Sequence, residues 1–171
     1  MANPLSKTAC ALSPWFYQGQ PVHQKTDLPG HELLYGYVYL IRDKLTGKLY
    51  VGQKSFGRAT KKKATIKEKA AALALNARSH IKIVRGRKES DWLIYWGSNL
   101  QLQADVAEHG GARFTREIID LACSKKYLGF SELEQMLKHN VLRRTEAYND
   151  NILGKFFRRD LLNCPEEDLT I

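Results

Sequence analysis

Cysteine, proline and long apolar runs are all scarce in this sequence, and the scarcity excludes several classes of protein. The three cysteines, Cys10, Cys123 and Cys164, stand far apart, with no C-x-x-C motif and no histidine at zinc-finger spacing. They predict reduced, structural thiols rather than a disulfide framework or a zinc finger. No apolar run approaches a membrane span, and the first residues lack the basic start and continuous apolar stretch of a signal peptide. We therefore expect a cytoplasmic protein with no membrane partner.

The size and composition of the chain predict one globular domain. Its 171 residues fall in the range of about 100–200 that is common for a single domain. Hydrophobic residues make up 43% of the chain and charged residues 26%, which is an ordinary balance for a protein with a packed core. Folding therefore needs no metal or disulfide support.

Acidic residues are nearly absent from one long stretch, which is the most informative feature of the composition. Between Arg42 and Lys88 there are fifteen Lys or Arg against only Asp43 and Glu68, while the whole chain has a net charge of +9. Such a concentration of positive charge is typical of a protein that binds a phosphate backbone. A solvated lysine-rich helix and an acidic protein partner are the alternative interpretations.

The chain order predicts an α+β fold. Residues 1–34, interrupted by prolines, are expected to form an irregular arm. Alternating apolar residues predict strands over 36–42 and 48–52; if Arg42 pairs with Gly47, Tyr39 lies directly opposite Tyr50. Further elements are helices over 58–78, 100–111 and 131–144, a strand over 113–123, a loop over 148–157 and an acidic C-terminal tail over 159–171. Together they predict a small antiparallel sheet flanked by helices.

An ordered set of motifs runs through the chain. Tyr37-Val38-Tyr39 is followed after ten residues by Tyr50-Val51-Gly52, then by F-x-R-E-I at 114–118, Glu134 and Tyr148-Asn149. Over residues 35–158 this set resembles the GIY-YIG nucleases, most closely their phage-type homing or restriction-like members. The resemblance implies a three-stranded antiparallel sheet with surrounding helices, hydrolysis of DNA with one divalent metal ion and, for a phage-type member, the cytoplasm of an infected bacterium. Residues 58–90 would then be a basic helical insertion.

The two tyrosines of the triplets are the first candidate catalytic residues. Tyr39 and Tyr50 match phenols that lie at the family's active centre, where one is proposed to help activate the attacking water. A phenol with a pKa near 10 is a poor base at neutral pH unless a cation stabilises the phenolate. Basic surroundings favour that state here. The alternative is that tyrosine is simply favoured in strands and in cross-strand pairs.

Glu134 and Asn149 match two further positions of the family. Glu134 corresponds to its metal-binding glutamate, and a carboxylate oxygen suits Mg²⁺ or Mn²⁺ completed by water and phosphate oxygens. The alternative is a capping box, because Ser131-Glu-Leu-Glu134 also fits the start of a helix. Asn149 would steady the hairpin or the phosphate, or else form an Asx turn.

The remaining candidates are the cations and one aromatic residue. The family places an arginine on the helix after the second triplet; Arg58 is our choice, with Lys61 and Lys62 as rivals. Tyr95, in the aromatic stretch 92–98, is assigned to the family's next polar position, although it would also suit the core. The residues expected to bind DNA, most simply as a duplex, are Lys54, Arg58, Lys61, Lys62, Lys63, Lys67, Arg85, Arg87 and Lys88.

These residues predict a metal-dependent DNA endonuclease. The alternative from another class is a non-catalytic nucleic-acid-binding protein or regulator that keeps the same fold. A protein-binding module using the basic stretch is a third interpretation. The oligomeric state and the DNA site are not predicted.

Overall fold

A computed structural model describes residues 13–76, 78 and 80–162 of the chain. Cys10, Cys164 and most of the predicted acidic tail lie outside the described residues, whereas Cys123 is a free thiol on the surface. The strands are β1 (Trp15–Tyr17), β2 (Gln20–Val22), β3 (Gly36–Asp43), β4 (Leu49–Ser55), β5 (Gly57–Lys63), β6 (Ile83–Glu89), β7 (Phe114–Ala122), β8 (Asn151–Ile152) and β9 (Phe156–Phe157). The α-helices are α1 (Ile66–Leu75), α2 (Leu100–His109), α3 (Lys125–Lys138) and α4 (Arg158–Leu162), and the 3₁₀ helices are η2 (Lys25–Asp27), η3 (Trp92–Ile94) and η4 (Gly111–Arg113).

The α+β class is confirmed, but the sheet is larger than predicted. Five strands lie in the order β2-β1-β7-β3-β4. The predicted three-stranded antiparallel unit is its part β7-β3-β4, and β1 adds to β7 in parallel, which makes the sheet mixed. The two extra strands come from residues 15–22, for which we expected no regular structure. Each has only three residues, too few for an alternating pattern to be recognised.

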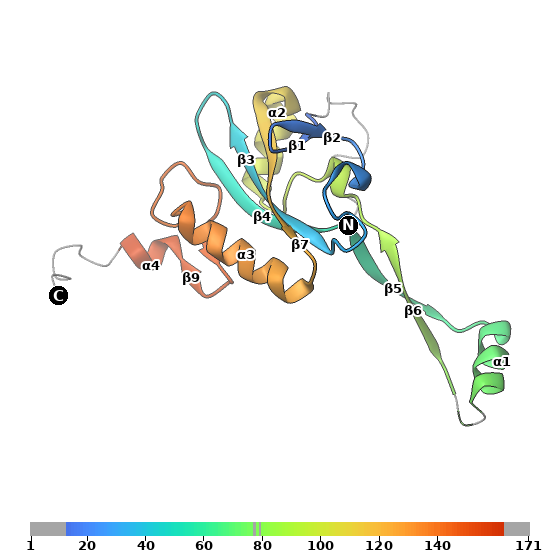
Figure 1. Cartoon of the computed structure of the whole chain (residues 1–171). Coiled ribbons are helices and arrows are strands. Elements are labelled where there is room, and N and C mark those ends of the chain that lie inside the picture. Colours follow the sequence, from blue (N-terminus) through green and yellow to red (C-terminus); the bar gives the residue numbers. More distant parts are fainter. Residues whose placement is uncertain (1–12, 77, 79, 163–171) are drawn as a thin grey trace.

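Helices cover both faces of the sheet (Figure 1), and the residues buried on each face form a separate core cluster. On one face, Tyr37, Tyr39 and Ile41 pack with η3 and α2. On the other face, Val38 and Leu40 pack against α3. This division confirms the predicted alternation along β3. Among the described residues, no helix is both long enough and apolar enough to cross a membrane.

The register of the β3–β4 hairpin differs from the prediction by two residues. Arg42 pairs with Leu49, so Tyr39 lies opposite Gly52 and Tyr50 lies opposite Ile41. The loop is longer because the Asp43 carboxylate accepts hydrogen bonds from the Leu45 N–H and the Thr46 hydroxyl. Gly47 does adopt the predicted left-handed conformation, with φ of 72°. A shift by two residues keeps both tyrosines on the same face.

The basic insertion is a β-ribbon with a helix at its end, so the predicted long helix over 58–78 is wrong. Strands β5 and β6 pair along their whole length, and α1 lies between them in sequence (Figure 1). Thr65 forms a capping box with Glu68, and an N-cap residue has non-helical backbone angles. The helix therefore begins only after Thr65, and the lysines before it are extended.

Candidate active site

Three tyrosines meet on the face of the sheet that carries η3. Tyr39 comes from β3 and Tyr50 from β4, and their ring centroids lie 6.1 Å apart. Tyr95, directly after η3, stands at 88° to the Tyr39 ring with 6.2 Å between centroids. The Tyr50 hydroxyl lies 3.2 Å from the Ser98 hydroxyl. The structure therefore brings the three predicted phenols together from three separate elements.

Two glycines make room for these phenols. A Cβ atom at Gly52 would lie 2.6 Å from the Tyr39 hydroxyl oxygen and 2.9 Å from Tyr50 Cε1. A Cβ atom at Gly97 would lie 2.8 Å from Tyr50 Cε1, and Gly97 has a φ of 90° that side chains rarely adopt. Gly52 is the last residue of the second triplet. Its lack of a side chain lets the Tyr39 hydroxyl reach across β4, the edge strand of the sheet.

Burial keeps the Tyr39 and Tyr95 phenols protonated. Burial raises the pKa of Tyr39 well above its usual value, and the neighbouring Tyr50 and Tyr95 phenols raise it further. Burial also raises the pKa of Tyr95. In the protein alone, Tyr39 and Tyr95 are thus neutral hydrogen-bonding groups at neutral pH. The expectation that basic surroundings stabilise a phenolate is wrong for Tyr39, because desolvation outweighs them.

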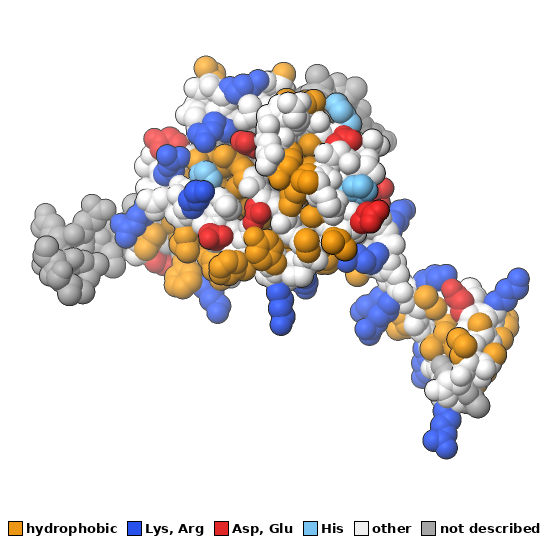
Figure 2. Space-filling view, viewed as in Figure 1, with side chains coloured by type: hydrophobic (Ala, Val, Ile, Leu, Met, Phe, Trp, Pro, Cys, Tyr) orange, Lys and Arg blue, Asp and Glu red, His pale blue; other side chains and the backbone are white. Residues whose placement is uncertain are grey.

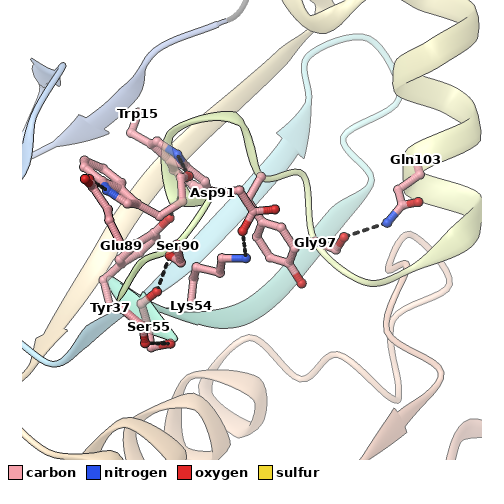
Figure 3. A network of polar contacts seen from close by, with 12 residues as sticks. Trp15, Tyr37, Lys54, Ser55, Glu89, Ser90, Asp91, Gly97 and Gln103 are labelled. Carbon is pink, nitrogen blue, oxygen red and sulfur yellow. Dashed lines mark hydrogen bonds and ion pairs between the residues drawn. The ribbon is translucent and has the colours of Figure 1, made fainter. Parts of the chain in front are cut away.

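The cation that lies in this site is Lys54 of β4. Its ammonium group stands 3.5 Å from the centroid of the Tyr95 ring and forms a 2.6 Å ion pair with Asp91 (Figure 3). Lys54 lies two residues beyond Gly52, so its side chain leaves β4 on the same face as the Gly52 position and Tyr50. The exposed fraction of its side chain is only 16%. A positive charge is therefore fixed beside the phenols.

Arg58 lies outside this cluster. We expected it on a helix, but β4 is followed by strand β5, where Arg58 is exposed and pairs with Lys88. Its charge contributes only weakly to lowering the pKa of Asp91, after the contribution of Lys54. Lys61 and Lys62 lie still farther along the ribbon. Lys54, expected only to bind DNA, is the better placed cation.

Glu134 lies on an exposed part of α3. Helix α3 begins at Lys125 behind the N-cap Ser124, so Glu134 lies inside the helix and the capping-box alternative is wrong. Ser131 is buried there and donates a hydrogen bond to Asp120. The Glu134 side chain is exposed, and its charge acts on Tyr127. The role of Glu134 as a metal ligand stays a prediction, whereas the charge of Glu132 is the one that acts on Tyr39.

Glu132 is the α3 carboxylate whose charge acts on Tyr39. Residues two apart in a helix point to nearly opposite sides, so Glu132 is turned toward the sheet when Glu134 is turned outward. The backbone N–H and the side chain of Gln53 hydrogen-bond to it, and its charge adds to the rise in the pKa of Tyr39. Burial raises the pKa of Glu132 itself. The sequence signal was present, since Glu132 stands in the same motif, but the helix start was misplaced.

Asn149 steadies the hairpin, which was one of its predicted roles. Its side-chain oxygen accepts a hydrogen bond from the Val51 N–H at 2.9 Å, and its amide donates to the Val51 carbonyl at 2.8 Å. The Asx-turn alternative is wrong, because both groups of the amide are used on β4. Arg158 in turn donates to the Asn149 carbonyl oxygen. Asn149 thus fixes β4 between Tyr50 and Gly52.

One buried residue, Arg116, was not expected from any sequence pattern. Its guanidinium lies between the Trp15 and Trp96 rings, 4.6 and 4.5 Å from their centroids. It donates to the carbonyl oxygens of Leu93 and Tyr95, and burial lowers its pKa to about 10. Arg116 therefore ties the backbone that carries Tyr95 to β7. An arginine within a strand pattern is normally assigned to the surface.

The donors present suit a single hard cation. Among the described residues there is no group of three or more His, Cys, Asp or Glu side chains that would enclose a metal ion. Mg²⁺ commonly binds through one or two carboxylates, keeps several waters and takes substrate phosphate oxygens as further ligands. A single half-buried carboxylate, that of Glu132 at the β4 edge, fits this mode of binding.

One comparison with known proteins identifies the family. A family model described as "Putative endonuclease segE, GIY-YIG domain" matches residues 15–152. No curated protein and no solved structure matches the chain. The match covers most of the chain and includes every element of the candidate active site. The chain therefore belongs to the SegE-type GIY-YIG endonuclease family, a family of nucleases that act on nucleic acid.

Proposed function

We propose that this protein is a divalent-metal-dependent endonuclease that hydrolyses phosphodiester bonds in duplex DNA. The observation that carries the proposal is the convergence of Tyr39, Tyr50 and Tyr95 around two glycines, with Lys54 beside them and the charge of Glu132 acting on Tyr39. Strands favour aromatic residues in general. That preference does not account for glycines that make room for hydroxyl groups, or for a shielded lysine at the same place.

Each side chain has a distinct role in the proposed reaction. Glu132 holds Mg²⁺ or Mn²⁺, which when bound offsets the phosphate charge and lowers the cost of ionising a nearby phenol. Lys54 binds a phosphate oxygen and stabilises the charge that develops in the transition state. Tyr39 or Tyr50, after releasing its own proton to solvent, orients the attacking water and takes a proton from it. The water oxygen bonds to phosphorus in line as the bond to the 3′ oxygen breaks.

One observation favours the alternative of a non-catalytic nucleic-acid-binding protein. Because β4 leads into a strand, no helix of the described chain presents an arginine to the phenols, although the family resemblance implies one. The proposal requires Lys54 to serve in its place. A lysine supplies a point charge without the bidentate geometry of arginine, so the substitution is chemically sufficient but less directional.

Supercoiled plasmid, incubated with Mg²⁺, with Mn²⁺ or with EDTA, tests the proposal. We expect cutting only with the metals. Glu132→Gln should reduce the rate at least about 10²-fold, since it removes the anionic ligand and keeps an oxygen that can accept from Gln53. Glu134→Gln is the matched control, two residues away on the outer side of α3, and should cut at the wild-type rate. Both variants should unfold within a few degrees of the wild type.

The results separate the candidate functions. Cutting by Glu132→Gln together with inactive Glu134→Gln would assign the metal to the outer face of α3 and refute the site described here. If the wild-type protein binds DNA but does not cut it with either metal, the non-catalytic alternative holds.

A further inference from the structure

The segment Gly57–Glu89, here called the arm, leaves the body of the protein and returns to the same point. The Ser90 N–H donates to the Phe56 carbonyl at 2.8 Å, and the Ser90 hydroxyl donates to the Ser55 carbonyl at 2.6 Å (Figure 3). Lys54 and Asp91, which form the ion pair of the candidate active site, flank this root. The arm is therefore rooted directly beside the catalytic residues and extends away from the body (Figure 1).

The arm has no core of its own. No residue of β5, β6 or α1 is fully buried. An isolated two-stranded ribbon is only marginally stable in water, because it buries little apolar surface. The surface of the arm is thus available to a partner.

The charge of the arm indicates an anionic partner. It holds eleven Lys or Arg against two Glu, an excess of nine that equals the net charge of the whole chain. Figure 2 shows these basic side chains along the arm. In the ribbon, Lys61 lies directly opposite Arg85, and Arg58 lies opposite Lys88. Like charges in direct cross-strand pairs destabilise a ribbon, and binding to a polyanion would offset that cost.

The two faces of the ribbon differ. One face carries Thr60, Lys62 and Val84. Lys62 forms a 2.8 Å ion pair with Glu68 of α1, and the Thr60 and Val84 side chains are half-buried. The opposite face, with Lys61 and Arg85, is exposed. Arg87 on that exposed face is used at the root, where it donates to the Gly57 carbonyl and stacks on Tyr35. Arg58 and Lys88, near the root of the first face, are exposed as well. At the outer half, the first face is turned toward α1 through the Lys62–Glu68 ion pair, which leaves the Lys61–Arg85 face as the candidate DNA-binding surface.

We propose that the β5–β6 ribbon lies in the major groove of duplex DNA beside the scissile phosphate, with the Lys61–Arg85 face toward the bases. The inference rests on the proposed function for the identity of the substrate. A two-stranded ribbon fits the major groove, which is about 12 Å wide. Seven residues per strand extend about 23 Å, which corresponds to about seven base pairs. The arm therefore fixes the distance between the DNA segment it contacts and the bond that is cut.

Binding measured in EDTA tests this inference without any cleavage. Fluorescence anisotropy of a labelled duplex is recorded against salt, and then with methyl green, which occupies the major groove, or netropsin, which occupies the minor groove. Methyl green should displace the wild-type protein and netropsin should not. A variant in which Asn-Gly replaces residues 57–89 should bind about tenfold or more weakly and lose its sensitivity to methyl green. The bond from Ser90 to Phe56 allows this short closure.

A pair of charge-matched variants tests which face is used. Lys61→Gln with Arg85→Gln should lower the log–log salt slope by about 0.9 for each phosphate that the variant no longer neutralises. Lys62→Gln with Lys88→Gln removes the same charge from the other face and should change the slope less. Both pairs lie on exposed surface, so thermal unfolding should match the wild type.

The inference is overturned if the variant without the arm binds as tightly as the wild type, if netropsin rather than methyl green competes, or if both charge pairs change the slope equally. If the protein binds DNA in a way that methyl green abolishes but does not cut DNA with a metal, only the proposed nuclease activity is refuted. If the protein cuts DNA normally and the variant without the arm binds DNA as tightly as the wild type, only the inference about the arm is refuted.

Discussion

Replacing Gly52 by alanine should displace the Tyr39 hydroxyl and slow the proposed reaction. A Cβ atom there would stand 2.6 Å from the Tyr39 hydroxyl oxygen and 2.8 Å from Tyr39 Cζ. Ordinary contacts between heavy atoms lie near 3.5–4 Å, so the ring must move by roughly 1 Å. Tyr39 is only 1% exposed and packs on Trp15 with 5.1 Å between ring centroids. The displacement therefore has to be shared with the core.

The expected size of the effect follows from that displacement. Overpacking of this kind costs about 1–3 kcal/mol, which for a chain of this length lowers the unfolding temperature by roughly 2–10 °C. A 1 Å error in the position of a catalytic group can reduce a rate about 10²-fold. We expect Gly52→Ala to be folded, modestly destabilised and at least about 10²-fold slower in single-turnover cutting of a plasmid.

Two further variants separate the steric cause from a general loss of stability. Gly129→Ala lies in α3 with no atom within 4 Å of the added Cβ, and should be stabilising by about 0.5–1 kcal/mol and fully active. Adding Tyr39→Phe to Gly52→Ala removes the atom in closest contact and should restore part of the lost stability, but not the activity. If Gly52→Ala cuts at the wild-type rate with an unchanged unfolding temperature, the glycine does not position the phenol and our account of the second triplet is wrong.

Two other predictions concern stability. Arg116→Met should cost about 1–3 kcal/mol in urea unfolding, because the Leu93 and Tyr95 carbonyl oxygens lose their buried donor. A loss below about 0.5 kcal/mol would show that the arginine does not hold this loop. Arg113 holds the pKa of the Asp43 carboxyl far below its usual range, so the ion pair stabilises the fold above about pH 4 and its contribution disappears as the pH falls toward the folded-state pKa. Asp43→Asn should accordingly be less stable than the wild type at pH 7 and differ less from it at pH 3; an equal difference at both values would contradict the assignment.

Residue patterns predicted the central elements well. Alternation along 36–42 and 48–52 identified β3 and β4 and the faces of their side chains, since one-sided burial leaves a period of two in the sequence. Strand β7 and helix α2, with Gly110 at its end, were also found. These elements lie in the middle of the fold, where burial determines residue type.

The ribbon could not be predicted, because its residues are not buried. Lys and Ala favour a helix when nothing else decides, and residues 58–64 are rich in both. Pairing of these residues with β6, a strand that lies far along the chain, overrides that preference. The predicted hairpin register was wrong for a related reason. It was based on a four-residue turn ending at Gly47, whereas the hydrogen bonds accepted by Asp43 make the loop longer.

Glu132 is held in place by a hydrogen bond with the backbone of β4, the edge strand of the sheet. Strand β4 is an edge strand, and its outward N–H groups need acceptors or remain open to unwanted pairing. The Leu49 N–H donates to the Glu146 carbonyl, the Val51 N–H donates to Asn149, and the Gln53 N–H hydrogen-bonds to Glu132. The acceptors along one edge are thus a main-chain carbonyl, a side-chain amide and a carboxylate.

The same edge explains why the sequence alone did not distinguish Glu132 from Glu134. Both lie on α3 within one motif, and only the rotation of the helix against β4 decides which carboxylate meets the Gln53 N–H. That rotation is fixed by Leu128 and Ser131, which are buried. Gly52 lies between Val51, which donates to Asn149, and Gln53, which hydrogen-bonds to Glu132. It also lies beside the Tyr39 hydroxyl. The contact that completes the sheet at Gln53 therefore also holds Glu132 where its charge acts on Tyr39, so the proposed catalytic site depends on how this fold protects its edge strand.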